Sequence, residues 1–79
     1  MLETMITSPK TYIVNNVILK ENEAVELINI NIDMIIGSLK FDVINKNGNV
    51  FSFKYENVWA AMQTGWDVLP IINNSCEEF

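Results

Sequence analysis

Asp33 and Asp42 are the residues of this chain whose types and spacing come nearest to a charged site. The alternation of apolar and polar residues around them predicts paired strands that place the two carboxylates directly opposite each other. Such a pair could form half of a cation site or a contact for a basic partner. Two carboxylates without further oxygen donors hold Ca²⁺ or Mg²⁺ poorly. The favoured alternative is therefore a solvated pair relieved by Lys40 and Lys54.

Three glutamates, Glu21, Glu23 and Glu26, form a second acidic group. They could grip a basic groove or imitate phosphates, but Val25 and Leu27 dilute the charge, and a solvated loop is the favoured interpretation. The whole chain carries five Lys and no Arg against ten Asp and Glu, so its net charge is −5. Direct binding of nucleic acid needs several cations against phosphate and is not expected, whereas the acidic balance suits a partner with a basic surface.

Trp59 and Trp66 are candidate contact residues, because tryptophan is enriched among interface hot spots. The chain has only 79 residues, however, and few other ways to build a core. Burying a large apolar side chain is worth roughly 1.5–3 kcal/mol. We therefore expect at least one of the two tryptophans to lie in the core.

The chain lacks the residues that most enzymes use. It has no His, the commonest general base near neutral pH. Its one cysteine, Cys76, stands beside Glu77 and Glu78, whose negative charge disfavours a thiolate. The sequence shows no nucleophile–base pair, phosphate-binding glycine loop, metal-ligand cluster or cofactor fingerprint. We expect a protein that is not an enzyme and uses no cofactor or metal.

A hairpin over residues 38–55 is the best-determined element. Apolar residues alternate with polar ones on both sides of a turn-rich break at residues 45–49. A three-residue loop at 46–48, with Gly48 left-handed, keeps the apolar residues on one face, whereas a two-residue turn would mix the faces. The predicted pairs are Val43 with Phe51, Phe41 with Phe53, and Leu39 with Tyr55.

Residues 27–34 alternate as well, and a two-residue turn at Gly37 and Ser38 predicts a second hairpin. This turn places Ile28 and Ile30 on the same apolar face as the first hairpin. The predicted pairs are Ile36 with Leu39, Met34 with Phe41, and Ile32 with Val43. The result is a three-stranded antiparallel meander with residues 39–45 in the middle.

The remaining elements are less constrained. Residues 11–19 favour one strand beside the meander, with a small hairpin turning at Asn15 and Asn16 as the alternative. Residues 57–64 predict a helix, capped by Asn57 and ended at Gly65, that rests on the aromatic face of the sheet.

The fold class follows from these elements. Pro70 restricts residues 67–72 to an extended edge strand or strap. We expect an α+β fold, in which a small antiparallel sheet of four to five strands, open or curled toward a barrel, carries one short helix.

The reverse face of this sheet is not cleanly polar, because Ile35, Ile44 and Val50 fall on it. Ile13, Val17 and Leu27 would join them if the first strand pairs as predicted. One possibility is that the chain covers this face itself, because the sheet curls or because the C-terminal segment lies over it. The other is that this face contacts another protein chain, since exposed apolar patches mark interfaces. The two possibilities are evenly balanced.

Composition sets the domain organisation. We expect one domain over residues 11–72, a loose lead-in over 1–10 and an acidic tail over 73–79. No apolar run is long enough to cross a membrane and no signal peptide is visible, so a cytoplasmic location without membrane contact is expected.

The leading hypothesis for function is a small acidic interaction protein that binds, and in one version inhibits, a larger macromolecular partner. The richness in Asn and Ile and the use of Lys rather than Arg indicate an AT-rich genome. A small, acidic chain of this composition is similar in type, though not in any motif, to the accessory and anti-defence proteins of bacteriophages and mobile elements. The alternatives are a structural homo-oligomer built through the sheet edge or the second face, and a small-ligand binder with its pocket between helix and sheet.

Overall fold

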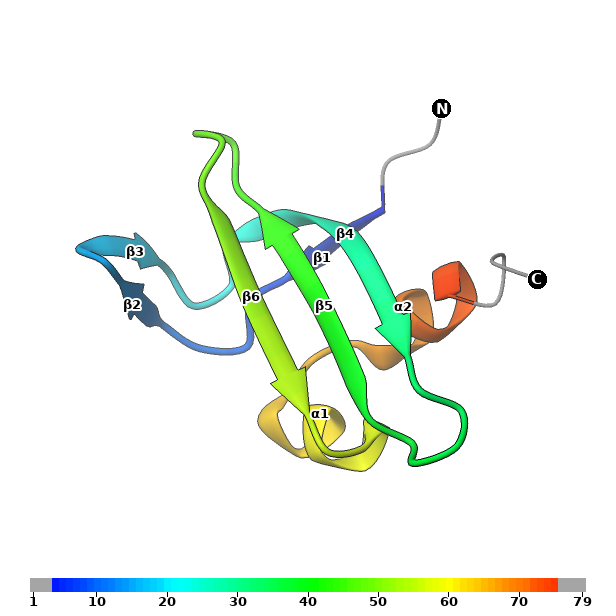
Figure 1. The fold of residues 1–79 in the computed structure, drawn as a ribbon. Coiled ribbons are helices and arrows are strands. Elements are labelled where there is room, and N and C mark those ends of the chain that lie inside the picture. Colours follow the sequence, from blue (N-terminus) through cyan, green and yellow to red (C-terminus); the bar gives the residue numbers. More distant parts are fainter. Residues whose placement is uncertain (1–3, 76–79) are drawn as a thin grey trace.

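The computed structural model describes residues 4–75, with the side chain of Ser75 left out. Cys76 and the last residues of the expected acidic tail lie outside the described residues. Six strands and two helices follow one another along the chain (Figure 1): β1 (Met5–Thr7), β2 (Tyr12–Val14), β3 (Val17–Leu19), β4 (Ala24–Ile32), β5 (Leu39–Ile44), β6 (Val50–Tyr55), α1 (Val58–Thr64) and α2 (Val68–Ser75).

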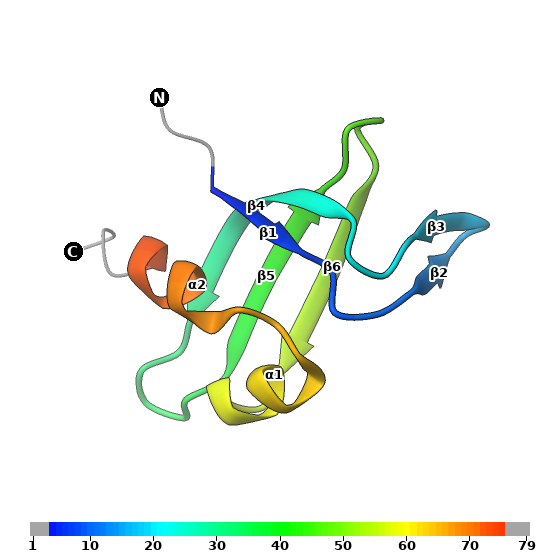
Figure 2. The same ribbon diagram turned by 180° about the vertical axis from the view of Figure 1, so that it is seen from behind.

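The fold is α+β, as the sequence predicts. Four strands form an antiparallel sheet in the order β1-β4-β5-β6, while β2 and β3 form a separate hairpin that projects beyond β6 (Figure 1). The sheet is open rather than closed into a barrel. Both helices lie over the same face of the sheet, seen from the front in Figure 2. The opposite face, turned toward the viewer in Figure 1, carries no helix or strand of the described chain.

The β5–β6 hairpin confirms the three-residue loop. Val43 pairs with Phe51, Phe41 with Phe53 and Leu39 with Tyr55. The Asn45 N–H donates a 3.0 Å hydrogen bond to the Asn49 carbonyl, which closes the loop. Gly48 has a φ of 86°, the left-handed conformation that such a loop requires of it.

The predicted pairing of β4 with β5 is wrong. Ile32, not Ile36, pairs with Leu39, and Leu27 pairs with Val43. Residues 33–38 form a loop instead of four further residue pairs and a tight turn. The cause lies in Asp33, whose carbonyl accepts the Gly37 N–H at 2.7 Å and so turns the chain four residues earlier than predicted.

A bulge at Asn29 changes the faces of β4. The pairing register shifts by one residue between Ile28 and Asn31, and Asn29 adopts a φ of 52°, which asparagine tolerates better than most residues. Leu27 is therefore buried in the core and Ile28 points to the uncovered face, the reverse of the prediction. Beyond the bulge, Ile30 packs against the core as predicted.

The N-terminal third also differs from the expectation. Residues 11–19 form the β2–β3 hairpin, the alternative interpretation, with Asn15 and Asn16 at φ values of 50° and 66° in its turn. This φ > 0 pair suits a tight two-residue hairpin turn. Residues 5–7, expected in a loose lead-in, pair with β4 as strand β1.

Two helices close the fold, where one was predicted. Helix α1 is confirmed: the Asn57 side chain accepts the Ala60 N–H at 2.8 Å, and Gly65 ends the helix with a φ of 116°. Residues 67–72, however, form helix α2 and not an extended strap. Pro70 is tolerated because it lies in the first turn, where a backbone N–H has no partner within the helix.

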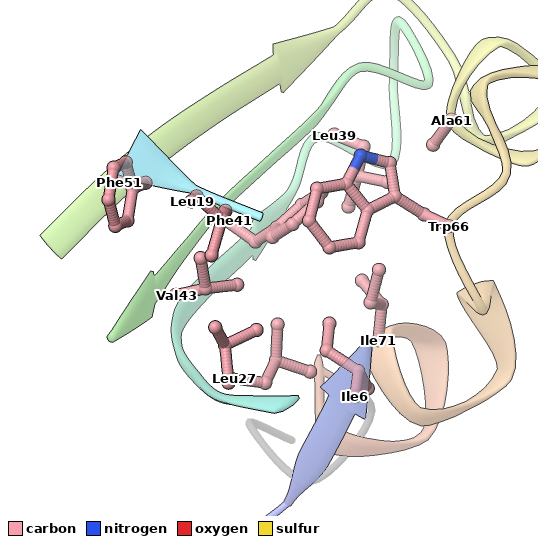
Figure 3. Packing of buried hydrophobic residues seen from close by; sticks show 11 residues of the cluster. Ile6, Leu19, Leu27, Leu39, Phe41, Val43, Phe51, Ala61, Trp66 and Ile71 are labelled. Atoms are coloured by element: carbon pink, nitrogen blue, oxygen red, sulfur yellow. The ribbon is translucent and has the colours of Figure 1, made fainter. Parts of the chain in front are cut away.

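The core lies between the helices and the covered face of the sheet. Figure 3 shows Trp66 pointing into it near Leu39 and Ile71. Trp66 is 3% exposed, and its ring centroid lies 5.2 Å from that of Phe41 and 4.9 Å from that of Phe53. The expectation that at least one tryptophan is core is confirmed. The buried apolar residues are Ile6, Leu19, Val25, Leu27, Leu39, Phe41, Val43, Phe51, Ala61, Trp66 and Ile71.

Candidate protein-interaction surface

The loop between β4 and β5 exposes three consecutive large apolar side chains. Met34, Ile35 and Ile36 are 75%, 95% and 71% exposed. Single exposed apolar residues are normal on a protein surface, but a contiguous group is not. The loop lies at the end of the sheet where β4 stops and β5 begins (Figure 1).

Hydrogen bonds hold the loop in one conformation. The Asp33 carboxylate oxygen Oδ1 accepts the N–H groups of Ile35 and Ile36 at 2.9 and 3.3 Å. The Asp33 N–H donates to the Ser38 carbonyl at 2.9 Å, which closes the base of the loop. The exposed side chains are thus presented by a fixed backbone, and a partner would have little loop entropy to remove on binding.

Helix α1 adds two apolar residues at the same end of the sheet. Leu39, the first residue of β5, pairs with Tyr55, the last residue of β6, and α1 begins three residues later. On its outer side, Trp59 is 63% exposed and Met62 is exposed as well. The term "end surface" is used below for Met34, Ile35, Ile36, Trp59 and Met62.

Carboxylates flank the segments that carry the end surface. Asp33 precedes the loop, Glu56 precedes α1 and Asp67 follows it, and all three are exposed. Lys40 and Lys54 are paired with each other across β5 and β6 and point to the uncovered face, while Lys10 follows Pro9, which lies against Gly65 at the end of α1. The border of the end surface is therefore mainly acidic.

The predicted acidic pair does not exist. Asp33 lies in the loop, while Asp42 lies in the middle of β5 between Ile28 and Ser52. The bulge residue Asn29 donates a 3.0 Å hydrogen bond from Nδ2 to the Asp42 carboxylate. The other Asp42 oxygen is buried without a partner in the described part of the chain. The four-residue change of register separates the two aspartates that the predicted pairing brings together.

The uncovered face of the sheet carries apolar residues, as predicted for Ile44 and Val50. These two face each other at the loop end of the β5–β6 hairpin, and Glu26 lies beside Ile44 on β4. Val50 is 52% exposed and Ile44 is half-buried. Ile35, expected on this face, is in the loop of the end surface instead. No described segment covers the face.

The glutamates do not form one site. Glu21 and Glu23 border an open cleft of about 500 Å³ between the β3–β4 turn and the β5–β6 loop, which Lys20 and Lys46 also line. The Glu23 carboxylate accepts the Lys20 N–H at 3.0 Å, a local turn contact. Glu26 points elsewhere, to the uncovered face. Charges of both signs in a shallow cleft do not select a ligand.

Of the predicted contact residues, the end surface unites Ile35 and Trp59, with Asp33 at its border. Trp66 belongs to the core. Prediction from sequence missed Met34, Ile36 and Met62. A signal for the first two was present, because residues 34–36 form an apolar run that breaks the alternation just before Gly37.

Residues 4–75 contain no group of three or more His, Cys, Asp or Glu placed to hold a metal ion. None of the described helices is both long and apolar enough to cross a membrane. Comparison with protein-family models, with curated proteins and with solved structures gave no match to this chain.

Proposed function

We propose that this chain is a non-catalytic interaction protein that binds a larger protein through the end surface. The observation that carries the proposal is Ile35, which is 95% exposed in a loop held by the Asp33 hydrogen bonds. An apolar side chain that is exposed to water contributes no hydrophobic stabilisation. If a partner buries it, the burial is worth roughly 1.5–3 kcal/mol of binding free energy.

The surroundings of the end surface suggest the chemistry of the partner. Its centre is apolar and includes the exposed tryptophan Trp59, a residue type common at hot spots. Its acidic border, from Asp33, Glu56 and Asp67, favours a partner with an apolar depression bordered by Lys or Arg. The same border opposes docking on an anionic lipid surface.

Inhibition is the more specific part of the proposal. A chain of 79 residues with a net charge of −5 can occupy the working surface of a larger basic protein without bringing chemistry of its own. This mode of action fits the accessory and anti-defence proteins of phages and mobile elements, to which the composition is similar in type.

Site-specific photocrosslinking tests the proposal. A photoreactive amino acid is placed at position 35, or at position 13 as a control, because Ile13 is also an exposed isoleucine but lies on the β2–β3 hairpin. In lysate of the source cells, position 35 should give a defined adduct that position 13 does not. Trp59→Ala in the same chain should reduce that adduct.

The captured protein is then purified and its affinity measured. We expect Ile35→Ser to weaken its binding at least tenfold, while Ile13→Ser leaves it unchanged. Vesicles of neutral lipid, and of neutral and anionic lipid mixed, provide the comparison for membrane docking. Equal adducts from positions 35 and 13, or sedimentation with either vesicle, would overturn the proposal.

A further inference from the structure

Strand β6 forms one edge of the sheet, and one side of its backbone is unpaired. The hydrogen bond between Asn45 and Asn49 identifies the bonded pairs of the β5–β6 ladder, which recur at every second residue. The bonded residues of β6 are therefore Phe51, Phe53 and Tyr55. The backbone N–H and C=O groups of the other three, Val50, Ser52 and Lys54, point away from β5.

This edge has little of the usual protection against pairing, with Lys54 as its one charged residue. Val50, Ser52 and Lys54 are exposed and make no hydrogen bond from these groups within residues 4–75. Strand β6 has six residues with no bulge in its pairing and no proline. Edges of this kind are templates for another strand. The opposite edge, β1, has only three residues.

The β2–β3 hairpin does not pair with this edge. It reaches β6 on the covered face of the sheet, where the Tyr12 and Phe53 rings meet edge to face with centroids 4.8 Å apart. Hairpin and β6 belong to separate sheets. The row of free backbone groups is thus bonded to no strand of the described chain, and the hairpin that projects past β6 lies toward the covered face (Figure 2).

We propose that a second copy of this chain occupies the edge, with the two β6 strands antiparallel about a two-fold axis at Ser52. In this register Ser52 faces Ser52 of the second copy, and Val50 faces Lys54 in both directions. All three free positions of each strand are then bonded. The two four-stranded sheets become one continuous sheet across the axis.

The charges of the edge fit a second copy. Lys54 is the only charged residue of β6, and the two-fold register sets it against the apolar Val50 and not against itself. Antiparallel pairing also brings Glu56, just beyond one end of β6, to the end where the second copy carries the Lys46 loop. Both residues are exposed, and the contact occurs twice by symmetry. Opposite charges of this kind select a register more than they add affinity.

The pairing goes beyond the proposed function and leaves its surface free. The end surface lies where β6 ends at Tyr55, so antiparallel strands carry the two end surfaces to opposite ends of the dimer. Each dimer then presents two partner-binding surfaces. Glu56 lies at both sites, but the variants that test the dimer, at positions 50 and 52, and those that test partner binding, at positions 35 and 59, are at different residues. Loss of the dimer and loss of partner binding are therefore separate results.

Two charge variants at one position test the register. Val50→Lys sets a lysine against Lys54 of the second copy, while Val50→Glu sets a carboxylate there, and both replace the same half-exposed surface residue. Sedimentation equilibrium of the 79-residue chain should show a dimer. Val50→Lys should raise the dissociation constant about tenfold relative to Val50→Glu, because each cross-strand pair occurs twice, and salt should narrow the difference.

A backbone variant supplies the second test. Ser52→Pro removes a free N–H that the β5–β6 ladder does not use, so proline is compatible with the monomer. Ser52→Pro should be monomeric and Ser52→Ala dimeric, with circular dichroism confirming that both are folded. A wild-type monomer, or equal dissociation constants for the two Val50 variants, would overturn the proposal.

Discussion

The indole Nε1 of Trp66 donates a 2.8 Å hydrogen bond to the hydroxyl of Tyr55. This contact ties the segment that follows α1 to the last residue of β6, and so to the end of the sheet that carries the end surface. Trp66 is buried, and its polar atom has the partner that a buried indole needs. The position of α1, and of Trp59 on it, therefore depends on how Trp66 is packed.

The two tryptophans should respond very differently to the same change. Trp66→Ala is expected to lower the free energy of unfolding by about 3–5 kcal/mol, because it removes a large core side chain and leaves a cavity. Trp59→Ala, at a 63% exposed position, should change it by no more than about 0.5 kcal/mol. Urea denaturation followed by circular dichroism measures both, and a similar loss from the two variants would contradict the packing described.

Gly48 and Gly65 both have a positive φ, and comparing alanine variants of the two separates the cost of backbone strain from the cost of a steric clash. A Cβ at Gly48 meets nothing within 4 Å, whereas a Cβ at Gly65 would lie 2.8 Å from the Cβ of Pro9. Gly48→Ala should cost about 1–2 kcal/mol of unfolding free energy from backbone strain alone. Gly65→Ala adds a clash and should cost roughly 1–3 kcal/mol more. Thermal unfolding of both variants tests the order, and equal costs would show that the contact with Pro9 is unimportant.

Tyr12 gives the protein an alkaline pH dependence. Burial, the largest cause, and the neighbouring Tyr55 hydroxyl raise the pKa of Tyr12 to about 12 from its usual 10.0. The folded chain therefore keeps this proton more tightly than the unfolded chain does. Its contribution to stability is complete below pH 10 and should be lost as the pH rises toward 12. Urea denaturation at a series of alkaline pH values should show the decline.

Tyr12→Phe is the control for this effect and should flatten the alkaline profile. The Tyr12 hydroxyl oxygen is buried without a hydrogen-bond partner in the described residues. Removing it relieves an unpaired polar group, so the variant is expected to be as stable as the wild type near neutral pH, or more stable by up to about 1 kcal/mol. A marked loss of stability at neutral pH would indicate that the hydroxyl does have a partner.

Asp33 determines the order of the apolar loop. Asp33→Ala removes the acceptor of the Ile35 and Ile36 N–H groups and should speed hydrogen exchange at both amides. Asp33→Asn keeps an oxygen acceptor and should preserve most of the protection. Hydrogen exchange measured by NMR distinguishes the two, with the β5 amides as an internal reference. Equal exchange in both variants would mean that the side chain does not order the loop.

Much of the fold could be predicted from local rules. The β5–β6 register follows from the alternation and from the need for a left-handed residue at Gly48. Helix α1 follows in the same way from its two caps, Asn57 and Gly65. In these elements the residues that determine the geometry are neighbours in the chain. The local pattern is therefore compatible with a single structure, and that structure is the one found.

Prediction was wrong where the local pattern fits more than one structure. The run of alternating isoleucines in β4 is compatible with several registers, and the Asn29 bulge and the Asp33 turn select one of them. Pro70 is consistent with a strap or with a helix's first turn, and packing of Ile71 into the core favours the helix.

The candidate site, too, could be predicted from the sequence only in part. Types and spacing of residues were enough to identify Ile35 and Trp59 as contact candidates and to show that the chain is acidic. Only the tertiary structure brings those two residues to one end of the sheet and moves Trp66 into the core. The physical reason is that the register along β4 determines the neighbours of every residue beyond the Asn29 bulge, and the alternation of residue types alone fits more than one register.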